Sequence, residues 1–259
     1  MINIVDVTHH YGIRPVLRKV NLQVDTGQLV AVMGPNGMGK STLLGVAAGV
    51  LWPLKGYVEI NGLRRRTSAD DELAIRKQVV YLPDHPWLPK NSTGREFLVA
   101  VGRLYEIDDD RLMDHVDRLL GLFDLSKHGD SPIRSYSSGQ QKKIAICSAL
   151  ITEAPVMLLD EPFAGGLDPS AILALKRVLQ RLAERSDVTV LMATPVPEIV
   201  EGLAHKVVVI RDGEVIAYET PEGLRRITGC SGSLQEVLER LIHPQTLENI
   251  EKYFEEISA

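Results

Sequence analysis

The 259-residue sequence predicts an α/β fold with a mostly parallel sheet, an N-terminal antiparallel β subdomain and an inserted helical subdomain. Short apolar runs alternate with helical stretches, which indicates parallel strands covered by helices on both faces. Residues 87–153 carry helical periodicity without a strand pattern, and this predicts the insertion. We expect one domain whose core comprises 1–86 and 154–220, with a C-terminal helical extension at 221–259.

The expected elements are short and are separated by turn residues. Strands are predicted at 2–7, 16–24, 28–33, 57–60, 78–82, 156–159, 188–192, 206–211 and 215–218. Helices are predicted at 40–50, 93–105, 108–123, 138–151, 169–185 and 197–203. The amphipathic stretch at 234–257 is expected to form two helices, because Pro244 disfavours helical conformation at His243.

Composition and charge narrow the class of function. The chain is 44% hydrophobic, which suffices for a packed core, and its net charge of -5 disfavours nucleic-acid binding. Three arginines at 64–66 form the one basic cluster and are expected to be a solvated loop. The longest apolar stretch, 43–54, is too short to span a bilayer, so a role at a membrane would require a partner. Cys147 and Cys230 form no disulfide framework, and Cys147 is expected in the core.

A glycine-rich turn joins the strand at 28–33 to the helix at 40–50 and matches the pattern GxxxxGK(S/T). Glycines allow backbone N–H groups to approach phosphate oxygens, and the helix N-terminus favours an anion. The lysine can reach the β- and γ-phosphates, and the serine hydroxyl can bind Mg²⁺. The sequence therefore predicts a P-loop NTPase core that binds ATP and Mg²⁺ through Gly34, Asn36, Gly37, Gly39, Lys40, Ser41 and Thr42.

Two carboxylates, Asp160 and Glu161, end the apolar strand at 156–159. Asp160 can hold Mg²⁺ through water, and Glu161 can polarise the attacking water as a general base. On their own, these residues would be interpreted more simply as an acidic pair that caps a helix. A P-loop in the same chain favours the metal and catalytic roles.

Further motifs resemble those of one known family. The run YSSGQ at 136–140 resembles the LSGGQ signature of ATP-binding cassette (ABC) proteins and lies shortly before Asp160, as in that family. Leu167 and Asp168 resemble its D-loop, and Tyr11 matches the aromatic residue that stacks on adenine. With five motifs in the right order from Tyr11 to about residue 218, the chain resembles the nucleotide-binding subunit of an ABC transporter of the type paired with a separate membrane subunit.

This resemblance implies a head-to-tail dimer in which each ATP lies between the P-loop of one subunit and the signature of the other. Ser137, Gly139 and Gln140 would then contact the nucleotide bound by the facing subunit, at a helix N-terminus. A second interpretation, compatible with the first, makes Ser138 the N-cap with Gln141 as its capping-box partner. The resemblance also implies ATP hydrolysis coupled to transport. It implies two partners, a second ABC subunit that is identical or different and an integral membrane permease. Through the permease, the chain would lie in the cytoplasm on the inner face of the membrane.

The sequence departs from the family pattern at three places. The signature has Tyr136 in place of leucine and Ser138 in place of the first glycine. Asp84 replaces the glutamine that follows the strand at 78–82, although its carboxylate can still offer an oxygen to Mg²⁺. Pro195 replaces a histidine that touches the γ-phosphate, and Thr194 is expected to compensate in part with its hydroxyl. Loss of one preorganised donor costs roughly 10²–10³ in rate.

Two questions stay open at this point. The alternative to a transport subunit is a soluble or regulatory ABC-type ATPase with weak turnover caused by Pro195. Relatives that organise chromosomes have a long heptad segment, and translation factors of the family have a second P-loop; this sequence has neither. Trp87, which follows Asp84, either forms part of an exposed patch that contacts a membrane subunit or packs under the helical subdomain.

Overall fold

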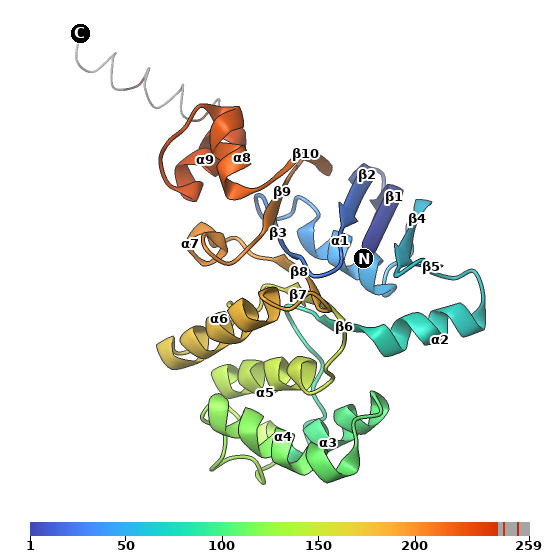
Figure 1. Cartoon of the computed structure of the whole chain (residues 1–259), viewed down its shortest axis with the longest axis vertical. Helices are drawn as coiled ribbons and strands as arrows, with labels where there is room; N and C mark the ends of the chain where they lie inside the picture. Colours follow the sequence, from blue (N-terminus) through green and yellow to red (C-terminus); the bar gives the residue numbers. More distant parts are fainter. Residues whose placement is uncertain (243–245, 247–252, 254–259) are drawn as a thin grey trace.

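The computed structural model describes residues 1–242, 246 and 253, and it contains two sheets surrounded by helices (Figure 1). The main sheet has the strand order β10-β9-β3-β8-β7-β6, in which β3 and β6 to β9 are parallel and β10 is antiparallel to β9. Strands β3, β7 and β8 are buried at every residue, as expected for a parallel sheet covered on both faces. The strands are β3 (Leu29–Met33), β6 (Val79–Leu82), β7 (Val156–Asp160), β8 (Thr189–Ala193), β9 (Lys206–Arg211) and β10 (Glu214–Glu219).

The second sheet is antiparallel and has the order β2-β1-β4-β5. Its strands are β1 (Ile2–His10), β2 (Pro15–Val24), β4 (Lys55–Ile60) and β5 (Leu63–Arg64). Helix α1 (Lys40–Ala48) contacts β1 and β2 on one side and β7 and β8 on the other, so it lies between the two sheets. The predicted core and antiparallel subdomain are confirmed. The sequence does not predict the short strand β5, and β4 begins at Lys55, two residues earlier than the predicted start at residue 57.

The inserted helical subdomain contains α3 (Gly94–Leu104), α4 (Asp109–Leu122), the short 3₁₀ helix η1 (Ile133–Ser135) and α5 (Ser138–Leu150). Figure 1 shows α3 to α5 grouped beyond the β6 end of the main sheet, next to α6 (Pro169–Ala183). Leu98, Val116 and Ile144, from three different helices, are completely buried in one apolar cluster. Cys147 is also buried there, as predicted, and both cysteines are free.

Helix α2 (Ala69–Gln78) was not predicted because it lacks an apolar face. Only Ile75 is buried in it. Its stability comes from its ends: the Ser68 hydroxyl accepts a hydrogen bond from the Asp71 N–H, acidic residues occupy the first turn, and basic residues occupy the last. Hydrophobic periodicity cannot reveal a helix of this kind.

The C-terminal part of the described chain contains α7 (Pro197–Val200), α8 (Pro221–Thr228) and α9 (Leu234–Ile242). Helix α7 is shorter than predicted, because the backbone leaves the helical region at Glu201 and Gly202 has a φ of 78°. Helices α8 and α9 pack against each other and cover β9 through Leu224 and Val237. The predicted division at His243 and Pro244 lies outside the described residues.

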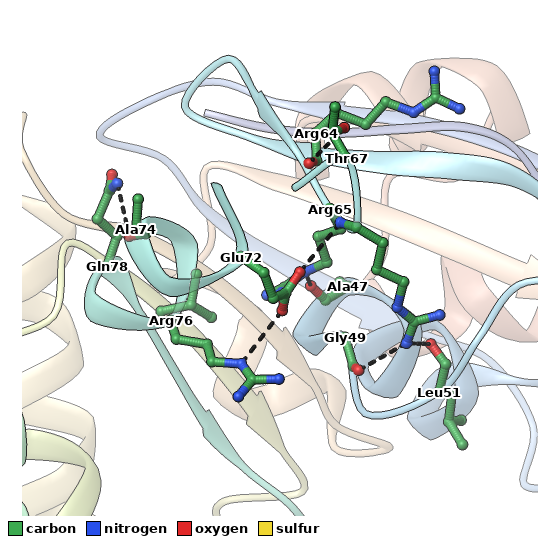
Figure 2. Close-up of polar contacts among 12 residues, drawn as sticks. Ala47, Gly49, Leu51, Arg64, Arg65, Thr67, Glu72, Ala74, Arg76 and Gln78 are labelled. Carbon is green, nitrogen blue, oxygen red and sulfur yellow. Dashed lines mark hydrogen bonds and ion pairs between the residues drawn. The ribbon is translucent and has the colours of Figure 1, made fainter. Parts of the chain in front are cut away.

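The prediction of a solvated loop at 64–66 is wrong for Arg65, whose side chain is only 5% exposed. Figure 2 shows its guanidinium between α1 and α2, where Nε donates to the Ala47 carbonyl at 2.8 Å and Nη1 pairs with Glu72 at 2.8 Å. Arg66 donates to the Gly49 carbonyl at 3.0 Å. Two cations therefore cap the C-terminus of α1, where carbonyl groups lack helical partners.

Candidate functional site

The P-loop, residues 34–41, connects the central strand β3 to helix α1. Gly34 has a φ of 150°, and a Cβ there would lie 2.1 Å from the Ile210 carbonyl oxygen in β9. Gly39 precedes α1 with a φ of 100°, and a Cβ there would lie 2.8 Å from the Val16 carbonyl oxygen. Only glycine fits both positions. The tight turn consequently ends at the N-terminus of α1, where free N–H groups and the helix dipole favour an anion.

Lys40 is the first residue of α1, and its ammonium group lies inside the P-loop. Nζ donates hydrogen bonds to the carbonyl oxygens of Gly34 at 2.8 Å and Pro35 at 3.1 Å, and to Oδ1 of Asn36 at 3.4 Å. Burial lowers the pKa of Lys40, and the charges of Glu161 and Asp160 raise it. The loop thus holds a positive charge close to those carboxylates.

Asp160, at the end of β7, is buried. Burial raises the pKa of the Asp160 carboxyl, and the Ser41 hydroxyl lowers it. The charges of Glu161 and Asp84 raise this pKa further, whereas that of Lys142 lowers it. Oδ1 of Asp160 is buried without a hydrogen-bond partner. An unpartnered carboxylate oxygen beside a serine hydroxyl fits Mg²⁺, which prefers oxygen ligands.

Glu161 follows Asp160 in an unusual backbone conformation. Its φ is 44°, which is uncommon for a residue other than glycine, and its N–H donates to the Ala193 carbonyl at 2.9 Å. Its side chain lines the same cleft as the P-loop. Strained backbone of this kind is found often at functional sites, where neighbouring structure holds it in place.

The loop after β8 lies next to these carboxylates, because Ala193 pairs with Asp160. Pro195 is exposed and offers neither a backbone N–H nor a polar side chain. Thr194 is 1% exposed, and its hydroxyl accepts a hydrogen bond from the Val196 N–H at 3.2 Å. This hydroxyl is therefore buried and accepts a hydrogen bond within its own loop, and its compensating role stays a prediction.

Asp84 follows β6 and is contacted by Lys142 from α5. Nζ of Lys142 donates to the Asp84 carbonyl at 3.1 Å and lies 3.6 Å from its carboxylate Oδ1. Burial lowers the pKa of Lys142, while Asp84, and after it Asp160 and Glu161, raise it. On its exposed side, the Asp84 carboxylate lies 3.4 Å from Nε2 of His85.

Lys143, whose side chain is buried, makes a second ion pair, with its Nζ 2.5 Å from Oδ2 of the half-exposed Asp168. Asp168 caps α6 by accepting a hydrogen bond from the Ala171 N–H at 2.8 Å. The hydrogen bond from Lys143 holds the pKa of Asp168 well below its usual range. Sequence reasoning missed Lys142 and Lys143. Two adjacent lysines inside an apolar helix were the available signal, because buried lysine is seldom unpaired.

The signature segment leads from η1 into α5. Ser137, not Ser138, is the N-cap, and it forms a capping box with Gln140. The alternative that placed the cap at Ser138 with Gln141 is therefore wrong by one residue. Tyr136 is 4% exposed, and its hydroxyl donates to the His128 carbonyl at 2.6 Å. A buried hydroxyl needs such a partner, so the tyrosine is accommodated where the family has leucine.

A cleft of about 330 Å³ brings most of the predicted residues together. Tyr11 lies at its edge, 67% exposed, with its hydroxyl 3.4 Å from Thr42 Oγ1. Gly34, Asp84 and Asp160 lie outside the cleft lining, and so do Ser137, Gly139 and Gln140 at the start of α5. The cleft is lined by Tyr11, Val16, Asn36, Gly37, Gly39, Lys40, Ser41, Thr42 and Glu161.

Within the part of the chain that the structure describes, no three His, Cys, Asp or Glu side chains gather to hold a metal by themselves. A metal bound with phosphate oxygens and the Ser41 hydroxyl does not need such a group. In the same described residues, no helix combines the length and the apolar character that crossing a membrane requires.

Comparisons with known proteins agree with this arrangement. The family model described as "ABC transporter" matches residues 17–164. The chain is 34% identical over 219 residues to the daunorubicin resistance ATP-binding protein DrrA3 of Streptomyces coeruleorubidus, and the alignment covers 85% of this chain and 68% of that protein. It is 32% identical over 231 residues to the ABC-type transporter ATP-binding protein EcsA of Bacillus subtilis, and this alignment covers 88% of this chain and 91% of that protein.

Solved structures show the same fold. An ATP-binding subunit of an ABC transporter superposes with a TM-score of 0.86 and 31% identity, covering 93% of this chain and 99% of that one. A dimeric ATP-binding cassette in a post-hydrolysis state with ADP and Pi superposes with a TM-score of 0.75 and 25% identity, covering 85% of this chain and 98% of that one. These matches extend well beyond the P-loop.

Proposed function

Because this chain belongs to the ATP-binding subunits of ABC transporters and is an ATPase, we propose that it dimerises head to tail around ATP and drives a separate membrane subunit by hydrolysis. The observation that carries this proposal is the cleft that unites an aromatic side chain, a P-loop and a carboxylate. Its three components suit the base, the phosphates and the attacking water of an ATP hydrolysis reaction.

Each residue of the cleft has a distinct role in this proposal. Tyr11 stacks on adenine, and Lys40 moves from its P-loop acceptors to the β- and γ-phosphates. Ser41, Asp160 and Asp84 hold Mg²⁺, which would supply positive charge to the phosphate oxygens. Glu161 accepts a proton from the attacking water. The remaining contacts to phosphate come from the P-loop backbone at Gly34, Asn36, Gly37 and Gly39, and from Thr42.

The other half of the ATP site comes from a second subunit, identical or different. Ser137, Gly139 and Gln140 lie outside the lining of the P-loop cleft of their own chain. Ser137 is exposed at the N-terminus of α5, an end of a helix that favours anions. This placement supports a signature that acts on ATP bound by the facing subunit.

A mixing experiment tests the composite site. Lys40→Met removes the P-loop charge and Ser137→Arg blocks the signature, both in a Glu161→Gln background that slows turnover. Neither variant alone can form an intact site, whereas a mixed dimer contains one site with Lys40 and Ser137 both present. We expect ATP-dependent dimers in the mixture only, measured by analytical ultracentrifugation. Dimers of either variant alone, at the level of the parent, would contradict the proposal.

An integral membrane permease is the proposed partner, and Trp87 is the proposed contact. Trp87 is 83% exposed, so the alternative in which it packs under the helical subdomain is wrong. Its neighbour Leu88 is buried and anchors the segment. We propose residues 87–153 as the moving unit, since it carries both Trp87 and the signature. Binding to the permease would place the chain at the cytoplasmic face of the membrane.

A second candidate function is a regulatory ATP sensor with weak turnover. Pro195 favours it, because the loop beside Asp160 and Glu161 presents no donor at this position. The two candidates differ in the rate of hydrolysis and share the mode of ATP binding. Turnover of Glu161 and Pro195 variants separates them.

A further inference from the structure

The proposed Mg²⁺ site brings the negative charges of Asp84 and Glu161 to bear on Asp160. Asp84 adds a carboxylate near Asp160, whose pKa is already raised by burial and by Glu161. ATP brings further negative charge to the same place. Like charges in a partly buried site repel strongly, so the site needs a cation when no metal is bound. Lys40 is engaged with the P-loop, and His85, 3.4 Å from the Asp84 carboxylate, is exposed to solvent. Lys142 is therefore the buried cation that contacts Asp84.

The position of Lys142 is supported by a contact that does not depend on the Asp84 carboxylate. Its stem lies next to Gly165, where a Cβ would come within 3.5 Å of Lys142 Cδ. Its Nζ donates to the Asp84 main-chain carbonyl at 3.1 Å, a shorter distance than the 3.6 Å to the carboxylate. The side chain is 4% exposed. The ammonium group can therefore stay in place when the Asp84 carboxylate turns away.

We propose that Lys142 is the internal counter-ion of the metal site. When Mg²⁺ and ATP bind, the Asp84 carboxylate turns from the Lys142 ammonium group to Mg²⁺. The Lys142 ammonium group stays hydrogen-bonded to the Asp84 main-chain carbonyl. This inference rests on the proposed function, in which Asp84 and Asp160 are metal ligands. Lys142 is a positioning residue, since it acts on the metal site through Asp84. Helix α5 carries both Lys142 and the signature. The change of partner at Asp84 therefore links the metal site to the helix that faces the second subunit.

Lys143 provides a matched comparison within the same helix. It is buried to a similar extent, with its side chain 7% exposed, and it also pairs with a carboxylate. Its partner is Asp168, the N-cap of α6, which is not among the proposed Mg²⁺ ligands. Removal of either lysine therefore removes one buried charge from α5, but only Lys142 faces the metal site.

The test compares ATP binding by the full chain in EDTA and in excess Mg²⁺, using calorimetric titration. We expect Lys142→Met to weaken binding about tenfold in EDTA, the size of effect expected for one lost charge in a partly buried site. Binding in Mg²⁺ should change by less than about threefold, because Asp84 then has the metal as its partner. Lys143→Met should leave the ratio of the two affinities at its wild-type value.

Adding Asp84→Asn to Lys142→Met removes the unpaired carboxylate and should restore binding in EDTA, completing a double-mutant cycle. Asp84→Asn alone should tighten binding in EDTA, and this variant serves if Lys142→Met does not fold. An unchanged ratio in Lys142→Met, or an equal shift in Lys143→Met, would overturn the counter-ion role while wild type still binds ATP. Failure of wild type to bind ATP in either condition would instead reject the proposed function.

Discussion

Two loops of the main sheet, the P-loop after β3 and the segment 194–196 after β8, differ sharply in what they offer to a phosphate. The strands β3 and β8 are parallel neighbours, so both loops leave the sheet at the same edge. The P-loop presents a glycine turn, a helix N-terminus and the ammonium of Lys40. The other loop presents Pro195 on its surface and turns the hydroxyl of Thr194 inward.

In the proposed function, this difference separates binding of the nucleotide from its hydrolysis. The groups that attract phosphate lie in the P-loop, whose geometry is imposed by close backbone contacts with β2 and β9. The groups proposed to act on water lie at the ends of β7 and β8, where Glu161 is present and a donor at Pro195 is missing. A loss in the second loop should consequently lower the rate and leave affinity nearly unchanged.

The largest expected effect comes from Glu161→Gln. Steady-state phosphate release should fall by about 10³, because a general base contributes roughly 10²–10⁴. ATP affinity should remain within about threefold of wild type, since the P-loop is untouched. Glu198→Gln, which changes an exposed carboxyl on α7, is the matched control and should have no effect. Equal rates for Glu161→Gln and wild type would mean that this chain turns over little ATP by itself.

Pro195→His should have the next largest effect, in the opposite direction. A histidine adds a donor beside Asp160 and Glu161, and turnover is expected to rise about 10- to 100-fold. Pro195→Ala removes the ring and adds a backbone N–H but no side-chain donor, and it should leave the rate near wild type. A clear rate for wild type and no gain from histidine would show that the loop after β8 is dispensable here. That outcome would favour the transport subunit over the ATP sensor.

The two loops also differ in how far the sequence could define them. The P-loop and the carboxylates after β7 were predictable, because local patterns of strand, turn and helix determine them. The burial of Thr194 was not predictable, because it depends on packing between β3 and β8, which are far apart in the sequence. Pro195 was identified only as a departure from the family pattern.

The contacts of Arg65, Lys142 and Lys143 show the same limit. Each side chain is buried by an element distant in the sequence: Arg65 by α1, Lys142 by the segment after β6, and Lys143 by the start of α6. A charged residue in isolation is expected at the surface. Its burial becomes visible only when the fold brings the opposite charge to it, which a local pattern cannot specify.

The smallest expected effect concerns Asp168, which caps α6 and pairs with Lys143 of α5. Asp168→Ala removes the N-cap of α6 and should lower the free energy of unfolding by about 1 kcal/mol near neutral pH, measured by urea denaturation. Because the pKa of Asp168 is depressed in the folded state, its contribution is present above the unfolded pKa of about 3.9 and is lost as the pH falls below it.

The difference between wild type and Asp168→Ala should therefore shrink on acidification below about pH 4. Ser170→Ala, which removes a hydroxyl that donates to the same carboxylate, keeps the cap and should change stability by less than about 0.5 kcal/mol. A difference that persists unchanged in acid would assign the stabilisation to the cap alone, without the charge of Lys143. The side chain of Asp168 is half exposed, so solvent screening keeps the contribution of this ion pair small.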